Sequence, residues 1–244
     1  MSDCALAVFA RHDSRRLPGK VLMDIGGRAM LGRVIDRLRL VRGGGPIVVA
    51  TSTRALDDPV AAYAESEAVG AFRGAAEDVA ARALACAEAN GFTRFVRISG
   101  DSPFIDPEIV ARLIERHLTL DLDLATNVWP RSFPAGASAE VISTQAMRRA
   151  CAEIDDDEDA EHVTRYFYRH PDAFRIFNLK APDERYAGVR LAVDDAGDLE
   201  RAAWILERLE DPAETAGLDD IVALARAWQR GRGAAAGAAK ARRA

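Results

Sequence analysis

Short apolar runs alternate with segments of helical spacing through the first part of the chain. The runs CALAVFA, PIVVAT and RFVRIS occupy residues 4–10, 46–51 and 94–99. Between them, apolar side chains recur at helical spacing over residues 30–41, 57–68 and 77–90. Strand–helix–strand repetition favours parallel pairing with right-handed crossovers. The pattern predicts an α/β fold with a mostly parallel central sheet flanked by helices, in which ligands bind beyond the carboxyl ends of the strands.

The second half continues the alternation with less regular spacing. It predicts strands at residues 122–126, 139–143, 174–179 and 190–193. It predicts helices at residues 107–117, 144–152, 160–169 and 219–230. It predicts a further helix that begins directly after Asp195. Asp106 and Pro107 stand where an N-cap and a first helical residue belong. We expect one domain over residues 1–230 with an insert at about 128–190, followed by a disordered basic Gly/Ala tail at 231–244.

Charge and cysteine content narrow the class of protein. The net charge of the chain is −5, and its last fifteen residues are basic. The net charge of the other residues is therefore more negative than −5. This balance argues against nucleic-acid binding. No apolar run approaches the ~18 residues of a membrane span, and the first ten residues lack the basic start of a signal peptide. The dispersed cysteines argue against a disulfide framework or a zinc site and favour a reducing cytoplasm. They are Cys4, Cys86 and Cys151.

A basic loop, ARHDSRRLPGK, follows the first predicted strand at residues 10–20. Guanidinium forks bind phosphate oxygens in bidentate fashion, lysine adds a point charge, and glycine lets backbone N–H groups approach a phosphate. Such a loop can surround a triphosphate, although the spacing is not that of a Walker A motif. A solvated basic turn is the alternative. The four cations are Arg11, Arg15, Arg16 and Lys20.

Two carboxylates follow later apolar runs. Asp101 comes just after the run at 94–99, and Asp194 ends the run LAVD. Mg²⁺ is typically held by one or two protein carboxylates together with phosphate oxygens, so this pair predicts a Mg²⁺–nucleotide site. Asp101 could instead form a turn or cap a helix. Asp195 or Asp198 would then cap the helix that follows Asp194.

The segment ARHDSRRLPGKVLMDIGGRAML resembles the opening of bacterial cytidylyltransferases, a group that includes enzymes activating Kdo, sialic and related nonulosonic acids. The similarity is closest to the spore-coat polysaccharide biosynthesis type. It continues through RISGDSPFIDPEIV, DAEHVTRYFY and VDDAGDLE and covers roughly residues 4–210. The resemblance implies a glycosyltransferase-A-like Rossmannoid fold with an inserted acceptor or dimerisation flap. It also implies CTP as donor, Mg²⁺ on Asp101 and Asp194, and a homodimer.

The resemblance also implies roles for individual residues. Those expected to act in catalysis are Arg16, Lys20 and Asp101. Those expected to bind the nucleotide are Ala10, Arg11, Ser14, Arg16, Lys20, Thr51, Ser52, Arg73, Asp78, Ser99 and Gly100. Those expected to bind the acceptor are Asn127, Arg131, Glu140 and His162. Ser138 stands where the family usually has an acidic residue, which leaves the acceptor open, and a lone His162 is otherwise a structural or surface residue.

The predicted function is transfer of CMP from CTP to an acidic sugar, a nonulosonic or Kdo-like acid or a related acceptor, with release of pyrophosphate. A glycosyltransferase that uses a nucleotide-sugar is one alternative. Such an enzyme usually carries a D-x-D metal motif, whereas this chain has Asp101-Ser102-Pro103. A non-catalytic nucleotide-binding protein is the other alternative, and retention of both aspartates and the basic loop argues against it.

Overall fold

A seven-stranded sheet with the order β3-β2-β1-β4-β6-β5-β7 forms the centre of the computed structural model, which describes residues 4–241 and the side chains of residues 4–231. The neighbours β3-β2, β2-β1, β1-β4 and β5-β7 are parallel, and β6 runs antiparallel to β4 and β5. The predicted α/β class with a mostly parallel sheet is therefore confirmed. The strands are β1 (Cys4–Phe9), β2 (Ile47–Ser52), β3 (Gly70–Gly74), β4 (Arg94–Ser99), β5 (Leu124–Thr126), β6 (Glu140–Ser143) and β7 (Ile176–Asn178).

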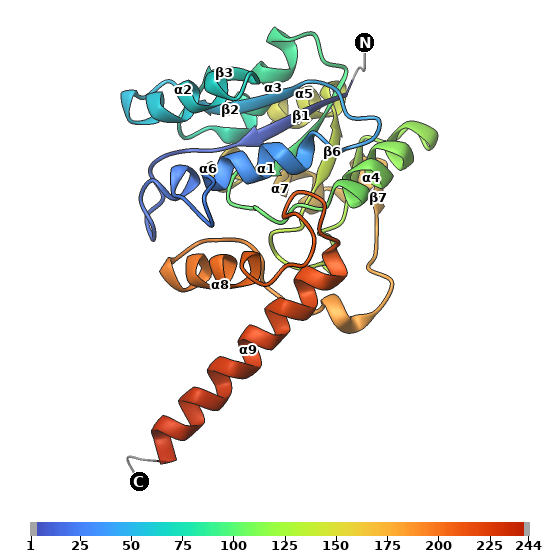
Figure 1. Cartoon of the computed structure of the whole chain (residues 1–244). Helices are drawn as coiled ribbons and strands as arrows, with labels where there is room; N and C mark the ends of the chain where they lie inside the picture. Colours follow the sequence, from blue (N-terminus) through green and yellow to red (C-terminus); the bar gives the residue numbers. More distant parts are fainter. Residues whose placement is uncertain (1–3, 242–244) are drawn as a thin grey trace.

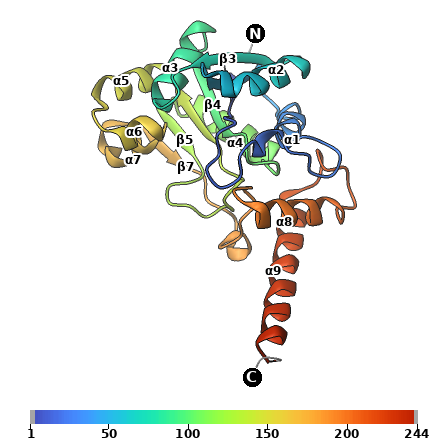
Figure 2. The same cartoon turned by 90° about the vertical axis from the view of Figure 1, so that its left-hand side faces the viewer.

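Helices cover both faces of this sheet (Figures 1 and 2). One buried cluster joins α1, α4, α8 and the start of α9 to residues such as Val8 and Ile98, and the other joins α3, α5 and α7 to Ala7 and Phe95. Successive strand residues point to opposite faces, so each strand contributes to both clusters. The helices are α1 (Met30–Leu38), α2 (Asp58–Ser66), α3 (Val79–Ala89), α4 (Pro107–Thr119), α5 (Thr144–Glu153), α6 (Asp157–Glu161), α7 (Arg165–Arg169), α8 (Ala196–Leu206) and α9 (Leu218–Ala241).

Two predicted caps are confirmed. Asp106 accepts the backbone N–H of Ile109 at 2.9 Å and starts α4, with Pro107 in its first turn. Asp195 accepts the N–H of Asp198 at 2.9 Å and starts α8. These carboxylates satisfy backbone donors that a helix leaves without an internal partner.

Three elements differ from the expectation. β3 was not predicted, because the sequence GAFRG carries two glycines, which weaken a strand pattern. The predicted helix at 160–169 is divided into α6 and α7, because the backbone at His162 is extended, with φ −113° and ψ 95°, and ends α6. Thr164, in the break, donates its hydroxyl to the buried Glu140 at 2.7 Å. The predicted strand at 190–193 is wrong. The N–H groups of Leu191 and Ala192 both donate to the single carbonyl of Ala135, so no ladder forms.

Two predictions from the sequence concern the organisation of the domain. The segment at 128–190, expected as an insert, supplies β6 and β7 to the central sheet and α5, α6 and α7 to one of its faces. Where the sequence predicts a disordered tail at 231–244, the backbone of α9 continues as a helix to Ala241 and extends away from the sheet (Figures 1 and 2). Alanine has the highest helix propensity, which favours such a continuation. The last three residues of the predicted tail lie outside the described residues.

Within the described range 4–241, no helix has the combination of length and apolar character needed to cross a membrane.

Candidate active site

The ammonium of Lys20 joins three parts of the chain at one point. Its nitrogen donates to Oδ2 of Asp101 at 2.7 Å, to Oδ1 of Asp194 at 2.9 Å and to the carbonyl of Val193 at 2.8 Å. Lys20 is 7% exposed, and these acceptors match the three donors of an ammonium group. The two aspartates expected as a metal pair therefore do lie together, with the Lys20 ammonium between them.

The position of Asp194 depends on how residues 190–193 cross the end of β4. The N–H of Val193 donates to the carbonyl of Asp101 at 3.0 Å, which fixes the two segments to each other. Gly136 has a φ of +96°, and a Cβ there would collide with the backbone of Ala192. This close backbone crossing, rather than the predicted strand, brings the second carboxylate to the first.

Asp194 is surrounded by cations. Its Oδ1 also lies 2.9 Å from Nη2 of Arg16, and its Oδ2 pairs with Arg190. Partial burial by itself raises the pKa of Asp194, but the hydrogen bond and charge of Lys20, together with Arg16 and Arg190, lower the pKa below its ordinary value. The carboxyl group is therefore held in its charged form.

The basic loop at 10–20 is folded back on itself and anchored by the short 3-10 helix at Ala55–Asp57 that follows β2. Gly19 has a φ of +71°, and its N–H donates to the carbonyl of His12 at 2.8 Å. The N–H of His12 donates to Oδ1 of the fully buried Asp57 at 2.7 Å, and Asp57 also binds the hydroxyl of Ser52. Ser52, expected beside the nucleoside, thus acts on the loop through Asp57.

A cavity of about 280 Å³ opens between the basic loop, β4 and the break between α6 and α7. Ala10, Val21 and Val79 contribute to its apolar lining. The combination of cations with strand-end carboxylates suits a phosphorylated ligand that carries a hard cation. The polar lining consists of Arg11, Asp13, Ser14, Lys20, Arg82, Arg97, Ser99, Asp101, Glu161 and His162.

The other expected nucleotide residues lie around this cavity rather than in its lining. Gly100 packs so closely on Ala10 that a Cβ would lie 2.8 Å from that of Ala10. Thr51 is fully buried at the end of β2, and its hydroxyl has no hydrogen-bond partner among the side chains and backbone described for residues 4–231. Arg73 donates to the carbonyls of Ser52 and Arg54 at 3.0 and 2.9 Å, and Asp78 caps α3.

The expected acceptor residues fall into two groups. His162 is exposed at the end of α6 and lines the cavity, and Arg131 is exposed, with Nη1 2.9 Å from the hydroxyl of Ser138. Asn127 and Glu140 are buried. The Asn127 side chain binds the carbonyl of Ala137 and the N–H of Ala139, which orders the loop between β5 and β6.

Sequence reasoning missed two cations in the cavity. Arg82, on α3, donates to the carbonyl of Ala76 at 3.2 Å, and burial lowers its pKa to about 10. Arg97 interrupts the apolar alternation of β4 and lines the cavity from that strand. Charged residues inside otherwise apolar elements were the available signal in both places.

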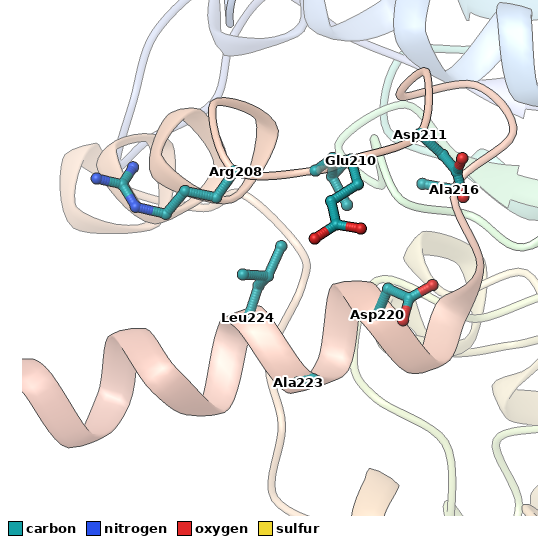
Figure 3. Close-up of a pocket in the computed structure, with 8 residues that line it drawn as sticks. Arg208, Glu210, Asp211, Ala216, Asp220, Ala223 and Leu224 are labelled. Atoms are coloured by element: carbon teal, nitrogen blue, oxygen red, sulfur yellow. The ribbon is translucent and has the colours of Figure 1, made fainter.

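A second cavity, of about 270 Å³, lies between α9 and the loop that follows α8. Figure 3 shows Glu210 and Asp220 on its two sides, with Leu224 from α9 beside them. Its lining contains three carboxylates, from Glu210, Asp211 and Asp220, and one arginine, Arg208. It shares no lining residue with the cavity at the basic loop, and its charge does not suit a nucleotide.

Comparison with known proteins shows the family of the chain. Residues 5–221 match the cytidylyltransferase family. The chain is 29% identical over 232 residues to the spore coat polysaccharide biosynthesis protein SpsF of Bacillus subtilis, covering 93% of this chain and 95% of that protein.

Two solved structures share the fold. A cytidylyltransferase from Leptospira borgpetersenii superposes with a TM-score of 0.85 at 24% identity, covering 96% of each chain. A CMP:2-keto-3-deoxy-manno-octonic acid synthetase solved with CTP superposes with a TM-score of 0.65 at 20% identity, covering 84% of this chain and 99% of the other. The sheet, the basic loop and the extent of the match lead to one assignment: this chain is a nucleotidyltransferase that belongs to the cytidylyltransferase family.

Proposed function

We propose that this enzyme transfers CMP from CTP to an acidic sugar, a nonulosonic or Kdo-like acid or a related acceptor. The observation that carries the proposal is the meeting of Lys20, Asp101 and Asp194 beside the basic loop. An acceptor hydroxyl oxygen attacks the α-phosphorus, the bond from that phosphorus to the bridging oxygen breaks, and pyrophosphate leaves. The acceptor hydroxyl gives its proton to solvent water as the new P–O bond forms.

Arg11, Ser14, Arg16 and Lys20 are the proposed ligands of the triphosphate. Arg11, Ser14 and Lys20 line the cavity, and Arg16 reaches Asp194 at its rim. The guanidinium and ammonium groups oppose the negative charge that builds up on the leaving pyrophosphate. Positioning and charge stabilisation supply most of the rate in phosphoryl transfer, so no covalent enzyme intermediate is needed.

Asp101 and Asp194 are the proposed ligands of Mg²⁺. Two carboxylates that converge on the same ammonium are oxygen donors of the kind that this hard cation prefers, so the residues fit the ion. Among the side chains that the structure describes, those of residues 4–231, no cluster of three or more His, Cys, Asp or Glu is arranged for a metal, so nucleotide oxygens or water would complete the shell. Mg²⁺ bound there would neutralise phosphate charge and polarise the attacking hydroxyl.

Arg131 and His162 are the proposed contacts of the acceptor, with Asn127 and Glu140 supporting them from buried positions. His162 opens to the same cavity as Asp101, which supports placing the acceptor between α6 and the end of β4. We also propose a homodimer. We propose a cytoplasmic location, which suits the three dispersed cysteines.

The proposal is tested by pyrophosphate release from CTP with Mg²⁺, against ATP, GTP and UTP. The acceptor panel contains 3-deoxy-manno-octulosonate, N-acetylneuraminate and related nonulosonic acids. We expect release with CTP and at least one acid, and formation of the matching CMP-sugar by mass spectrometry. Absence of release with every pair would overturn the proposal, and transfer of a sugar from a nucleotide-sugar would replace it with glycosyltransfer.

A further inference from the structure

Three polar side chains lie in a row across the sheet beside the cavity. Arg97 of β4 is the register partner of Glu140 of β6, and Glu140 is the register partner of Thr126 of β5. Tyr168 and Thr164 contact this row from the helical layer above it. The row lies on the sheet face covered by α3, α5 and α7, because Phe95 and Ile142, two residues away along the same strands, belong to that buried cluster.

Glu140 is closed off from ligands by its own partners. The residue is 1% exposed. Its Oε1 accepts hydrogen bonds from the hydroxyls of Thr164 and Tyr168, and its Oε2 lies 3.0 Å from Nη1 of Arg97. A buried carboxylate needs a cationic partner and several hydrogen bonds to offset the loss of hydration. Glu140 therefore fixes the position of Arg97 and does not itself face the cavity.

Arg97 is the member of the row that opens into the cavity. Its side chain is 30% exposed and lines the cavity together with Ser99 and Asp101, which follow it along the chain. Its Nε is buried and has no hydrogen-bond partner among residues 4–231, and its one ion pair in that range joins Nη1 to Glu140. A guanidinium carries five N–H donors, so the terminal nitrogens retain donors beyond the one that Glu140 uses, and their planar fork matches a carboxylate.

The other cations of the cavity have protein partners on the side of the basic loop and of α3. Lys20 is held by Asp101 and Asp194, Arg11 donates to the carbonyl of Ala76 at 3.1 Å, and Arg82 donates to the same carbonyl. Arg97 lies apart from the basic loop, on the strand that adjoins β6.

A second guanidinium, that of Arg131, lies within electrostatic range of the same carboxylate. Although Arg131 is exposed as a whole residue, partial loss of hydration lowers the pKa of its guanidinium, the charge of Glu140 raises this pKa, and the charge of Arg97 lowers it further. Glu140 pairs directly with Arg97 alone, so the charge of Arg131 adds positive potential beside this pair, which favours an anionic ligand.

We infer that Arg97 binds the carboxylate of the acceptor and selects acidic over neutral acceptors, with Glu140 as its positioning residue. The inference rests on the proposed cytidylyl transfer and adds the group that recognises the acceptor. Arg97 lies two residues before Ser99 and four before Asp101, so an acceptor held there reaches the end of β4, where the reaction is placed.

The test compares Arg97→Met with Arg94→Met. Arg94 is a matched control because it lies on the same strand, is half-buried and also has a buried Nε without a hydrogen-bond partner in the described part of the chain, but it does not line this cavity. We expect Arg97→Met to raise the KM for the acidic acceptor roughly 10- to 100-fold, as for loss of a charge-assisted hydrogen bond. Its KM for CTP should stay within about twofold, and Arg94→Met should change neither value.

A carboxamide analogue of the acceptor separates recognition from general damage. Wild-type enzyme should prefer the acid to the amide, and Arg97→Met should lose most of that preference. Arg97→Met leaves the buried carboxylate of Glu140 without its cationic partner. If the single variant unfolds for this reason, the double variant Arg97→Met/Glu140→Gln replaces it in the test. Glu140→Gln alone should raise the KM for the acid by a smaller factor and leave the KM for CTP unchanged.

The outcomes are distinguishable. An active wild-type enzyme whose acid-over-amide preference survives Arg97→Met would overturn this inference and leave cytidylyl transfer intact. An increase confined to the KM for CTP would do the same, since it would place Arg97 at the nucleotide. A wild-type enzyme that releases no pyrophosphate with any acid would overturn the proposed function, and the inference with it.

Discussion

The ammonium nitrogen of Lys20 lies 2.7 Å from Oδ2 of Asp101, although 81 positions separate the two residues in the sequence. The same nitrogen contacts Asp194, a further 93 positions along the chain. Lysine thus holds together two carboxylates that would otherwise repel each other. In the proposed reaction these carboxylates would bind Mg²⁺, and Lys20 would turn toward the phosphates of CTP.

Asp194→Asn should lower turnover on the order of 100-fold, the loss typical of one preorganised charged contact. Asp195→Asn is the control, because Asp195 caps α8 without contacting Lys20 and asparagine caps a helix as well as aspartate does. Pyrophosphate release from CTP measures both variants. Equal activities for the two would remove Asp194 from the proposed machinery.

Asp57→Ala should release the basic loop from its anchor, because the N–H of His12 loses a buried acceptor at 2.7 Å. We expect the KM for CTP to rise about tenfold and the free energy of unfolding to fall by about 1 to 3 kcal/mol. Asp24→Ala removes a comparable bond, to the N–H of Gly27 at 2.9 Å, from an exposed turn. Urea unfolding and CTP titration should separate the two, and identical KM values would contradict the anchoring role.

Gly19→Ala should distort the loop, because a Cβ at a φ of +71° would lie 3.1 Å from Nε2 of His12. Gly27→Ala has the same type of backbone conformation, with a φ of +83°, but a Cβ there meets no atom within 4 Å. Both variants should lose about 1 kcal/mol of stability from the left-handed conformation. Weaker CTP binding, measured by calorimetry, is expected for Gly19→Ala alone.

His117 should make stability depend on pH independently of the active site. Burial, with the charge of Arg94, lowers the pKa of this 3%-exposed side chain to about 4. Its pKa is about 6.5 when unfolded, so the unfolded chain binds the proton first. The stability contributed by neutral His117 is complete above pH 6.5 and is lost as the pH falls toward 4, by about 2 to 3 kcal/mol.

The measurement for His117 is the free energy of unfolding between pH 4 and pH 7. His117→Gln should flatten this dependence, whereas His170→Gln, at an exposed position, should leave it unchanged. If the free energy of unfolding of His117→Gln still depends on pH in this range, other groups cause the dependence.

The sequence alone determined most of the local elements and their order. Apolar periodicity predicted β1, β2, β4 and the helices between them, and Asp106 predicted the start of α4. Family resemblance then indicated a cytidylyltransferase, which the match over residues 5–221 confirms. These features are readable because a strand, a helix or a cap depends on residues a few positions apart.

Only the tertiary structure decided how the site is assembled. The bond from Val193 to the carbonyl of Asp101 brings Asp194 to Lys20. It belongs to a backbone crossing at residues 190–193, where an apolar run predicts a strand. The partnership of Arg97 with the buried Glu140 depends on the pairing of β4 with β6. Hydrogen bonds and ion pairs between distant segments leave no periodic pattern in the sequence, so they cannot be predicted from it. The sequence therefore identified most of the charged groups of the site, and the fold determined which of them meet.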